Sequence, residues 1–218
     1  MNDLNIAAVI RLLEEKLSAW ALPVVSLLAE EKSSPFLILI STVLSSRTKD
    51  EVTAQATEKL AAIAATPEEM VKLSEEVIIK AIYPVGFYRN KARTIRQICR
   101  ELIDRFNSGV PDTIDQLLTL KGVGRKTANL VVSLGFDKEG LCVDTHVHRI
   151  SNRLGYVKTK TPKETEYALR NKLPVEHWSR YNTLMVAFGQ HICLPVSPLC
   201  NRCSVAAYCD RVNVTRSR

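Results

Sequence analysis

The sequence has little that could lie in a membrane or direct export. Its longest apolar run, PFLILISTVL at 35–44, is interrupted by Ser41 and Thr42, whereas a membrane-spanning helix needs about 20 apolar residues in succession. The first residues, MNDLNIAAVIRLLEEKL, lack the basic segment and following apolar core of a secretory signal. We therefore expect a soluble globular protein of the cytoplasm.

Strand patterns are equally scarce, and no repeat, low-complexity tract or linker is evident. Almost every segment has helical periodicity instead. Asn2 or Asp3 can cap a first helix, Thr66 can cap another, and Thr161 followed by Glu164 resembles a capping box. The sequence thus predicts an all-α fold.

Charge is distributed unevenly. Residues 1–70 contain 6 Lys or Arg against 10 Asp or Glu, a net charge of −4, and residues 71–218 contain 24 against 13, a net charge of +11. Part of the basic excess lies in a long helix expected at 88–107. Ordinary solubility charge is the alternative, but this asymmetry favours a polyanionic partner, with nucleic acid the first candidate.

Two glycines interrupt the helical pattern in LKGVGRKTANLV at 120–131. A short helix before them and a longer helix after them predict a helix-hairpin-helix across 112–135. Gly122 and Gly124 can take backbone angles closed to other residues, and Val123 can anchor the turn in the core. The amides that open the second helix suit a phosphate oxygen. A plain connecting turn is the alternative, which the basic surroundings disfavour.

Four of the six cysteines fall within 17 residues, separated by six, two and five residues. Four thiolates so close in sequence can enclose one metal centre, either zinc or an iron–sulfur cluster. Disulfides are disfavoured in the cytoplasm, and Cys99 and Cys142 are expected to be ordinary buried thiols. The four candidate ligands are Cys193, Cys200, Cys203 and Cys209.

The hairpin segment, the string VDTHVHRISNRLG at 143–155 and the cysteine loop together resemble the endonuclease III family. These are DNA glycosylases of base excision repair that also cleave abasic sites. The resemblance runs from PFLILISTVLSSRTKD at 35–50 to Cys209. It implies a six-helix domain at 28–138 and a discontinuous domain, 1–27 plus 139–218, whose loop 193–209 holds a structural [4Fe-4S] cluster. Duplex DNA is expected to lie in a cleft between these domains.

Lys126 lies in the first turn of the second hairpin helix. A neutral lysine amine can attack a sugar C1′ and form a Schiff base. Desolvation, the neighbouring Lys121 and Arg125, and the helix N-terminus would all lower the pKa of its amine. A solvated lysine that contacts phosphate is the commoner role for this residue type, but the resemblance implies that Lys126 is the Schiff-base nucleophile.

Asp144 is placed by sequence as an N-cap of the helix that follows it. The resemblance gives it a second role, in which its carboxylate assists departure of the base and stabilises positive charge on the sugar. A metal site formed with His146 and His148 is disfavoured, because residues two apart point to different sides of a helix. The implied reaction flips the damaged base from the stack, displaces it with Lys126 and cuts the strand on the 3′ side by β-elimination.

Two positions differ from many relatives. Arg47 stands where glutamine commonly enters the gap left by the flipped base, and a phosphate contact is its alternative role. Phe87 stands where a leucine wedge is common, and a core aromatic is its alternative role. The loop at 194–199 also has no basic residue, and Arg202, Arg211, Arg216 or Arg218 could substitute. The residues expected to contact DNA are Lys121, Gly122, Val123, Gly124, Arg125, Arg47, Phe87 and His146.

The sequence therefore predicts a monomeric glycosylase and abasic-site lyase that removes oxidised pyrimidines from duplex DNA, nucleoid-associated in a prokaryote. A mismatch-specific thymine or uracil glycosylase of the same superfamily is the main alternative. A non-catalytic iron–sulfur DNA-binding protein would have no need of both Lys126 and Asp144. The adenine-specific branch generally lacks the lysine.

Overall fold

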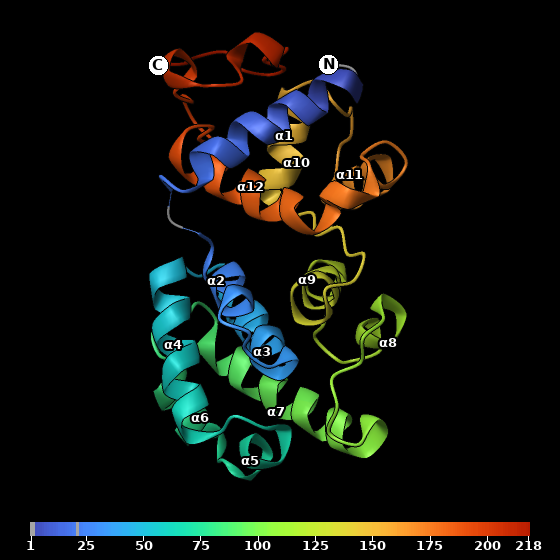
Figure 1. The fold of residues 1–218 in the computed structure, drawn as a ribbon. Coiled ribbons are helices and arrows are strands. Elements are labelled where there is room, and N and C mark those ends of the chain that lie inside the picture. Colours follow the sequence, from blue (N-terminus) through green and yellow to red (C-terminus); the bar gives the residue numbers. More distant parts are fainter. Residues whose placement is uncertain (1–2, 21) are drawn as a thin grey trace. The chain divides into compact units, whose positions relative to one another are not determined.

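The computed structural model describes residues 3–20 and 22–218, and it is helical as expected. The described residues contain α-helices and short 3-10 helices without a β-strand (Figure 1). None of these helices is long and apolar enough to cross a membrane. The chain divides into two compact units, one formed by Val24–Gly140 and the other by the segment up to Pro23 together with Leu141–Arg218.

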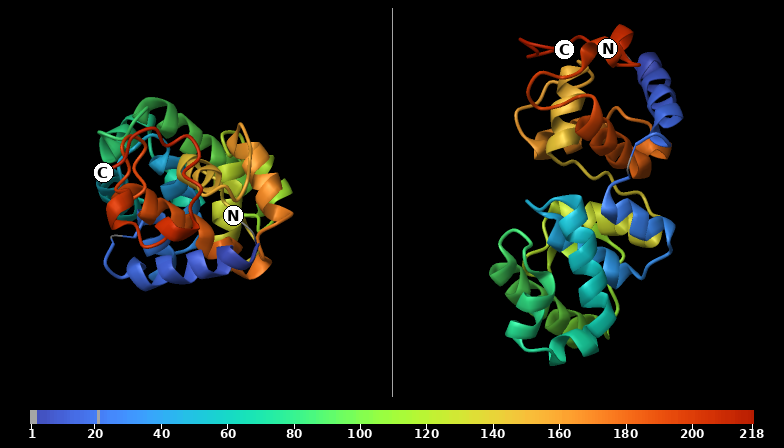
Figure 2. Two further views of the ribbon diagram at one scale, coloured as in Figure 1. Left: turned by 90° about the horizontal axis from the view of Figure 1, so that it is seen from above. Right: turned by 90° about the vertical axis from the view of Figure 1, so that its left-hand side faces the viewer.

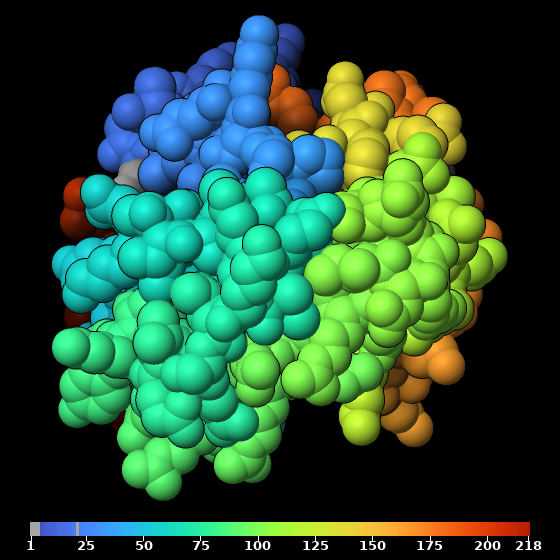
Figure 3. Space-filling view, turned by 90° about the horizontal axis from the view of Figure 1, so that it is seen from below, coloured from blue at the N-terminus to red at the C-terminus, as the bar shows by residue number. Residues whose placement is uncertain are grey.

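The Val24–Gly140 unit is built around one apolar helix. Helix α3 is buried along most of its length and packs against α2, α4, α7 and α9 (Figures 1 and 2). Helices α5 and α6, coloured teal, lie on the face that Figure 3 shows, and both pack against α7. The helices are α2 (Val24–Glu30), α3 (Pro35–Ser45), α4 (Asp50–Ile63), α5 (Pro67–Lys72), α6 (Glu75–Ile82), α7 (Tyr88–Phe106), α8 (Ile114–Leu118) and α9 (Arg125–Phe136).

This unit contains eight α-helices among its residues rather than the six expected. One addition is α2, which begins before the expected boundary at residue 28. Thr66 and Ser74 each cap a separate short helix, with the side-chain oxygens accepting from Glu69 N and Val77 N. The segment from Thr66 to Ile82 therefore forms two helices, each with its own cap.

The second unit packs its helices around a core that includes Tyr156, Tyr181 and Phe188. Helix α12 contacts both α1 and α10, and α10 contacts α11. Helix α1 begins at Asp3, and the alternative cap Asn2 lies outside the described residues. The elements are α1 (Asp3–Leu17), α10 (Thr145–Arg153), α11 (Pro162–Arg170), η1 (Val175–His177), α12 (Trp178–His191), η2 (Cys200–Arg202) and η3 (Ala206–Tyr208).

The predicted cap of α11 is present with one difference. Thr161 Oγ1 accepts from Glu164 N at 3.2 Å. Glu164 reaches back to the amide of Lys160, at 2.9 Å, rather than to the amide of Thr161 that a capping box uses. The first turn of α11 is therefore closed by side chains of its own sequence.

Candidate functional site

The hairpin between α8 and α9 requires glycine at one of its two glycine positions. Gly122 has a φ of +90°, and a Cβ there would lie 2.5 Å from Cγ2 of Thr94 on α7. Gly124 has an ordinary φ of −99° and open space where a Cβ would be. The prediction of special backbone angles is therefore wrong for Gly124. Val123 is buried, which confirms that it anchors the turn.

Helix α9 begins without a capping side chain, because its N-cap is Gly124. Gly124 O accepts from Ala128 N at 2.9 Å and so closes the first turn. The first-turn amides, together with the positive end of the helix dipole, form the kind of site that binds a phosphate oxygen. Lys121 and Gly124 are both exposed beside it.

Glu101 supports this hairpin, and the sequence did not predict its role. Its Oε2 accepts from the backbone N of Lys121 at 3.1 Å, and its Oε1 accepts from Gln97 Nε2 at 2.8 Å. Arg105 Nη1 lies 3.6 Å from the same Oε2. Gln97, Glu101 and Arg105 follow one another at four-residue intervals, which indicates a shared helix face. The four-residue spacing is visible in the sequence and indicates that these side chains share one face of α7. It does not show which segment that face contacts.

Lys126 lies in the first turn of α9, as predicted, and its side chain is exposed. The expected desolvation of its amine is therefore not provided by this structure. Behind it, Asn129 is buried and donates from Nδ2 to Arg125 O at 2.9 Å. The helix is thus packed into its unit behind the lysine, which is exposed.

Asp144 caps α10, as predicted. Its Oδ1 accepts from His146 N at 2.8 Å and from Val147 N at 2.9 Å, which fixes the carboxylate at the start of the helix. His146 Nδ1 lies 3.2 Å from Arg149 Nη2, whereas His148 Nδ1 lies 2.7 Å from Thr165 Oγ1. The two histidine rings therefore have different neighbours. Lys126 and Asp144 belong to different units.

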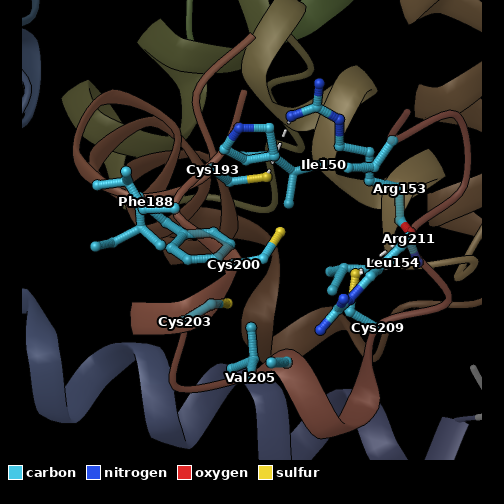
Figure 4. A pocket seen from close by; sticks show the side chains of 15 residues that line it. Ile150, Arg153, Leu154, Phe188, Cys193, Cys200, Cys203, Val205, Cys209 and Arg211 are labelled. Carbon is cyan, nitrogen blue, oxygen red and sulfur yellow. Dashed lines mark hydrogen bonds between the residues drawn. The ribbon is translucent and has the colours of Figure 1, made fainter. Parts of the chain in front are cut away.

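The four clustered cysteines line one cavity at the end of α12 (Figure 4). Burial raises the pKa of Cys203 to about 11 and also raises the pKa of Cys209. A bound metal centre would replace these protons. Two donors already point at the sulfurs, namely Arg153 Nη1 at 3.5 Å from Cys193 Sγ and Arg211 N at 3.4 Å from Cys209 Sγ. All six cysteines are free, and Cys99 and Cys142 are buried as expected.

The four thiols share one largely apolar cavity. Among the described residues, no three His, Cys, Asp or Glu side chains are placed to hold one metal ion. The sulfurs instead surround a cavity whose other walls include Ile150, Leu154 and Phe188. Four thiols around an apolar space, with N–H donors to sulfur, are typical of an iron–sulfur site.

Arg47 and Phe87 are brought together from segments 40 residues apart. The Arg47 guanidinium carbon lies 5.5 Å from the centre of the Phe87 ring. Phe87 is 59% exposed, so the alternative role as a core aromatic is wrong. Both residues have left-handed backbone angles, with φ of 53° and 58°, a conformation that is uncommon for side chains of this size.

The comparison with protein families agrees with this arrangement. Residues 40–175 match the model of the HhH-GPD superfamily base excision DNA repair protein. The chain is also 50% identical over 180 residues to the endonuclease III of Thermotoga maritima, which covers 83% of this chain and 84% of that protein. The chain belongs to the endonuclease III family.

Solved structures of the family extend the likeness to the fold. The structure of a non-covalent endonuclease III–DNA complex aligns with 97% of the present chain and 96% of the solved chain, at 33% identity and a TM-score of 0.85. The structure of a trapped endonuclease III–DNA covalent intermediate aligns with 82% of the present chain and 84% of the solved chain, at 39% identity and a TM-score of 0.77. By contrast, the alignment spans only about half, 48%, of the chloroplastic endonuclease III homolog 2 of Arabidopsis thaliana.

Proposed function

We propose that this protein is a DNA glycosylase and abasic-site lyase of base excision repair. The observation that carries the proposal is the exposed Lys126, presented at the uncapped start of α9 directly after a glycine hairpin. It is supported by membership of the endonuclease III family and by a solved relative trapped covalently on DNA. The hairpin binds the DNA backbone while the lysine reaches the sugar of a flipped nucleotide.

The reaction needs a nucleophile and a group that stabilises positive charge on the sugar. The Lys126 nitrogen bonds to C1′ as the bond between C1′ and the base breaks, and the base leaves with the electron pair. Opening of the sugar ring gives a protonated Schiff base. A proton then leaves C2′, the bond between C3′ and the phosphate oxygen breaks, and water releases the lysine. The strand is thereby cut on the 3′ side of the lesion.

Asp144 stabilises the positive charge that develops on the sugar and accepts the proton that the attacking amine loses. Its support is the double hydrogen bond to the amides of His146 and Val147. These bonds orient the carboxylate at the start of α10. The proposed substrates are oxidised pyrimidines and abasic sites in duplex DNA, acted on by a monomer.

The four cysteines of the 193–209 loop would hold a [4Fe-4S] cluster. When bound, the cluster cross-links four points of this loop through iron–thiolate bonds. Arg153 supports the same loop from α10, because its Nη1 donates to Leu194 O and its Nη2 to Pro195 O, both at 2.6 Å. The role of the cluster is thus structural, in keeping a long irregular segment folded.

Borohydride trapping tests the function. The cluster-loaded protein is mixed with duplexes that carry thymine glycol or an abasic site, and borohydride is added to reduce any Schiff base. A covalent adduct and a cut 3′ to the lesion are expected. Lys126→Ala should form no adduct, while Lys121→Ala, which removes a neighbouring exposed cation, should keep the adduct. No adduct from active, loaded wild-type protein would overturn the lyase assignment.

A further inference from the structure

Lys91 is a buried lysine that joins two distant segments of the Val24–Gly140 unit. It lies on α7 and is 8% exposed. Its ammonium Nζ donates to Leu44 O at 2.7 Å, to Ser46 O at 2.6 Å and to Thr48 Oγ1 at 3.0 Å. All three acceptors lie at the end of α3 or in the α3–α4 connection. The ammonium therefore uses its three donors on the end of α3 and the connection that follows it.

A buried cation without an acidic partner needs an explanation. No carboxylate in the described part of the chain pairs with Lys91. Burial lowers the pKa of Lys91 to about 8, so the side chain is still mostly charged at neutral pH. Leu44 lies in the last turn of α3 and Ser46 is its C-cap, where carbonyls lack a donor from within the helix. Ser46 O also accepts from Thr48 Oγ1 at 3.3 Å. A cation there satisfies these carbonyls and the negative end of the helix dipole.

A second contact holds the same connection to the segment before α7. Gly86 N donates to Thr48 Oγ1 at 3.1 Å, so one hydroxyl accepts from both Gly86 and Lys91. A Cβ at Gly86 would lie only 2.5 Å from Arg47 O. The backbones of Gly86 and Arg47 are therefore in direct contact, and position 86 has no room for a side chain.

These contacts surround the exposed Arg47–Phe87 pair. Arg47 lies between Ser46 and Thr48, both bonded to Lys91, and Phe87 lies between Gly86 and the first turn of α7. Each residue of the pair holds an uncommon left-handed backbone conformation, which persists only where surrounding contacts enforce it.

We propose that Lys91 is a positioning residue that makes the Arg47–Phe87 pair one preformed wedge for insertion into duplex DNA. The inference rests on the proposed function, since a wedge matters only for an enzyme that opens a duplex. Two loops that were free to move would have to be ordered upon binding, which weakens affinity. The lysine removes that cost without touching DNA itself.

The test is a double-variant cycle on DNA binding. Binding is measured with a duplex that carries a tetrahydrofuran abasic analogue, and with an undamaged duplex of the same sequence. Lys91→Met keeps the apolar stem and removes the ammonium, and it should raise the Kd for the analogue duplex about tenfold. The Kd for undamaged DNA, which depends on phosphate contacts, should change by less than about twofold.

Coupling to Phe87 distinguishes positioning from general destabilisation. Adding Lys91→Met to Phe87→Ala should weaken binding by less than about twofold further, because the wedge is already lost. Full additivity of the two losses would overturn the proposal. Arg93→Met is the matched control, since it removes an exposed cation from the same helix, where Arg93 pairs with Glu75. It should bind like the wild type.

Two further measurements keep the outcome decisive. If Lys91→Met does not fold, Thr48→Val removes the shared hydroxyl alone and enters the same cycle, with an expected loss of about threefold. Borohydride trapping of the wild type is run in parallel. A wild-type adduct with unchanged Kd in the Lys91 variant would overturn only the positioning role, whereas absence of the adduct would overturn the proposed function.

Discussion

Asp144 combines a structural and a catalytic role, and a pair of variants can separate them. Asp144→Asn keeps an oxygen that can accept from the amides of His146 and Val147 but removes the negative charge. Asp144→Ala removes both the oxygen and the charge. The capping role should respond only to the second substitution, whereas the chemical role should respond to both.

The magnitudes follow from the two hydrogen bonds of 2.8 and 2.9 Å. Loss of an N-cap costs about 1 kcal/mol, and Asn caps nearly as well as Asp. For a chain of this size, Asp144→Ala should therefore lower Tm by about 2–4 °C, and Asp144→Asn should leave Tm nearly unchanged. Loss of the charge should slow base release by roughly 10²–10⁴-fold in both variants.

The assay is single-turnover release of thymine glycol at saturating enzyme, with Tm measured on the same cluster-loaded samples. Thr161→Ala is the matched control, because Thr161 caps α11 in the same unit through its bond to Glu164 N. It should lower Tm to a similar extent and keep the full rate. A wild-type rate in Asp144→Asn would refute the catalytic role.

Three other outcomes are expected. The pKa of Lys91 is about 8 in the folded protein, below the value of 10.5 expected in an unfolded chain. Between these pH values the unfolded state binds more protons than the folded state. The free energy of unfolding of the wild type, measured by chemical denaturation, should therefore rise relative to that of Lys91→Met as pH increases from 8 to 10.5. Gly122→Ala should destabilise the hairpin, and adding Thr94→Ser, which removes the methyl group 2.5 Å away, should restore part of the stability but not the cost of the +90° φ. Cys203→Ser should abolish iron loading and lower Tm, whereas Cys142→Ala, at a buried thiol of the same unit, should retain the iron measured by elemental analysis.

Local signals in the sequence predicted much of the fold. Helix caps and tight turns each depend on a few neighbouring residues, so the sequence alone can predict them. This holds for the caps at Thr66, Thr161 and Asp144 and for the turn at Gly122. The four cysteines lie close enough in sequence for a shared site to be inferred. The cap at Ser74, which begins the separate helix α6, was not predicted.

Contacts between distant segments were not predictable in the same way. By sequence, Glu101 and Lys91 look like ordinary members of a charged helix. Each nevertheless binds backbone groups of a distant segment, 20 residues away for Glu101 and 45–47 for Lys91. Phe87 could equally have been a core side chain, and only its exposure decided the matter. These properties depend on tertiary packing, which periodicity does not encode.

The most direct test of the central claim is the position of the covalent link. Wild-type protein trapped by borohydride on an abasic duplex is digested with nuclease and protease, and the modified peptide is sequenced by mass spectrometry. The structure predicts a single modified residue, Lys126, and no adduct from Lys126→Ala. Modification at Lys121 or another amine, with an undiminished adduct from Lys126→Ala, would contradict the assignment.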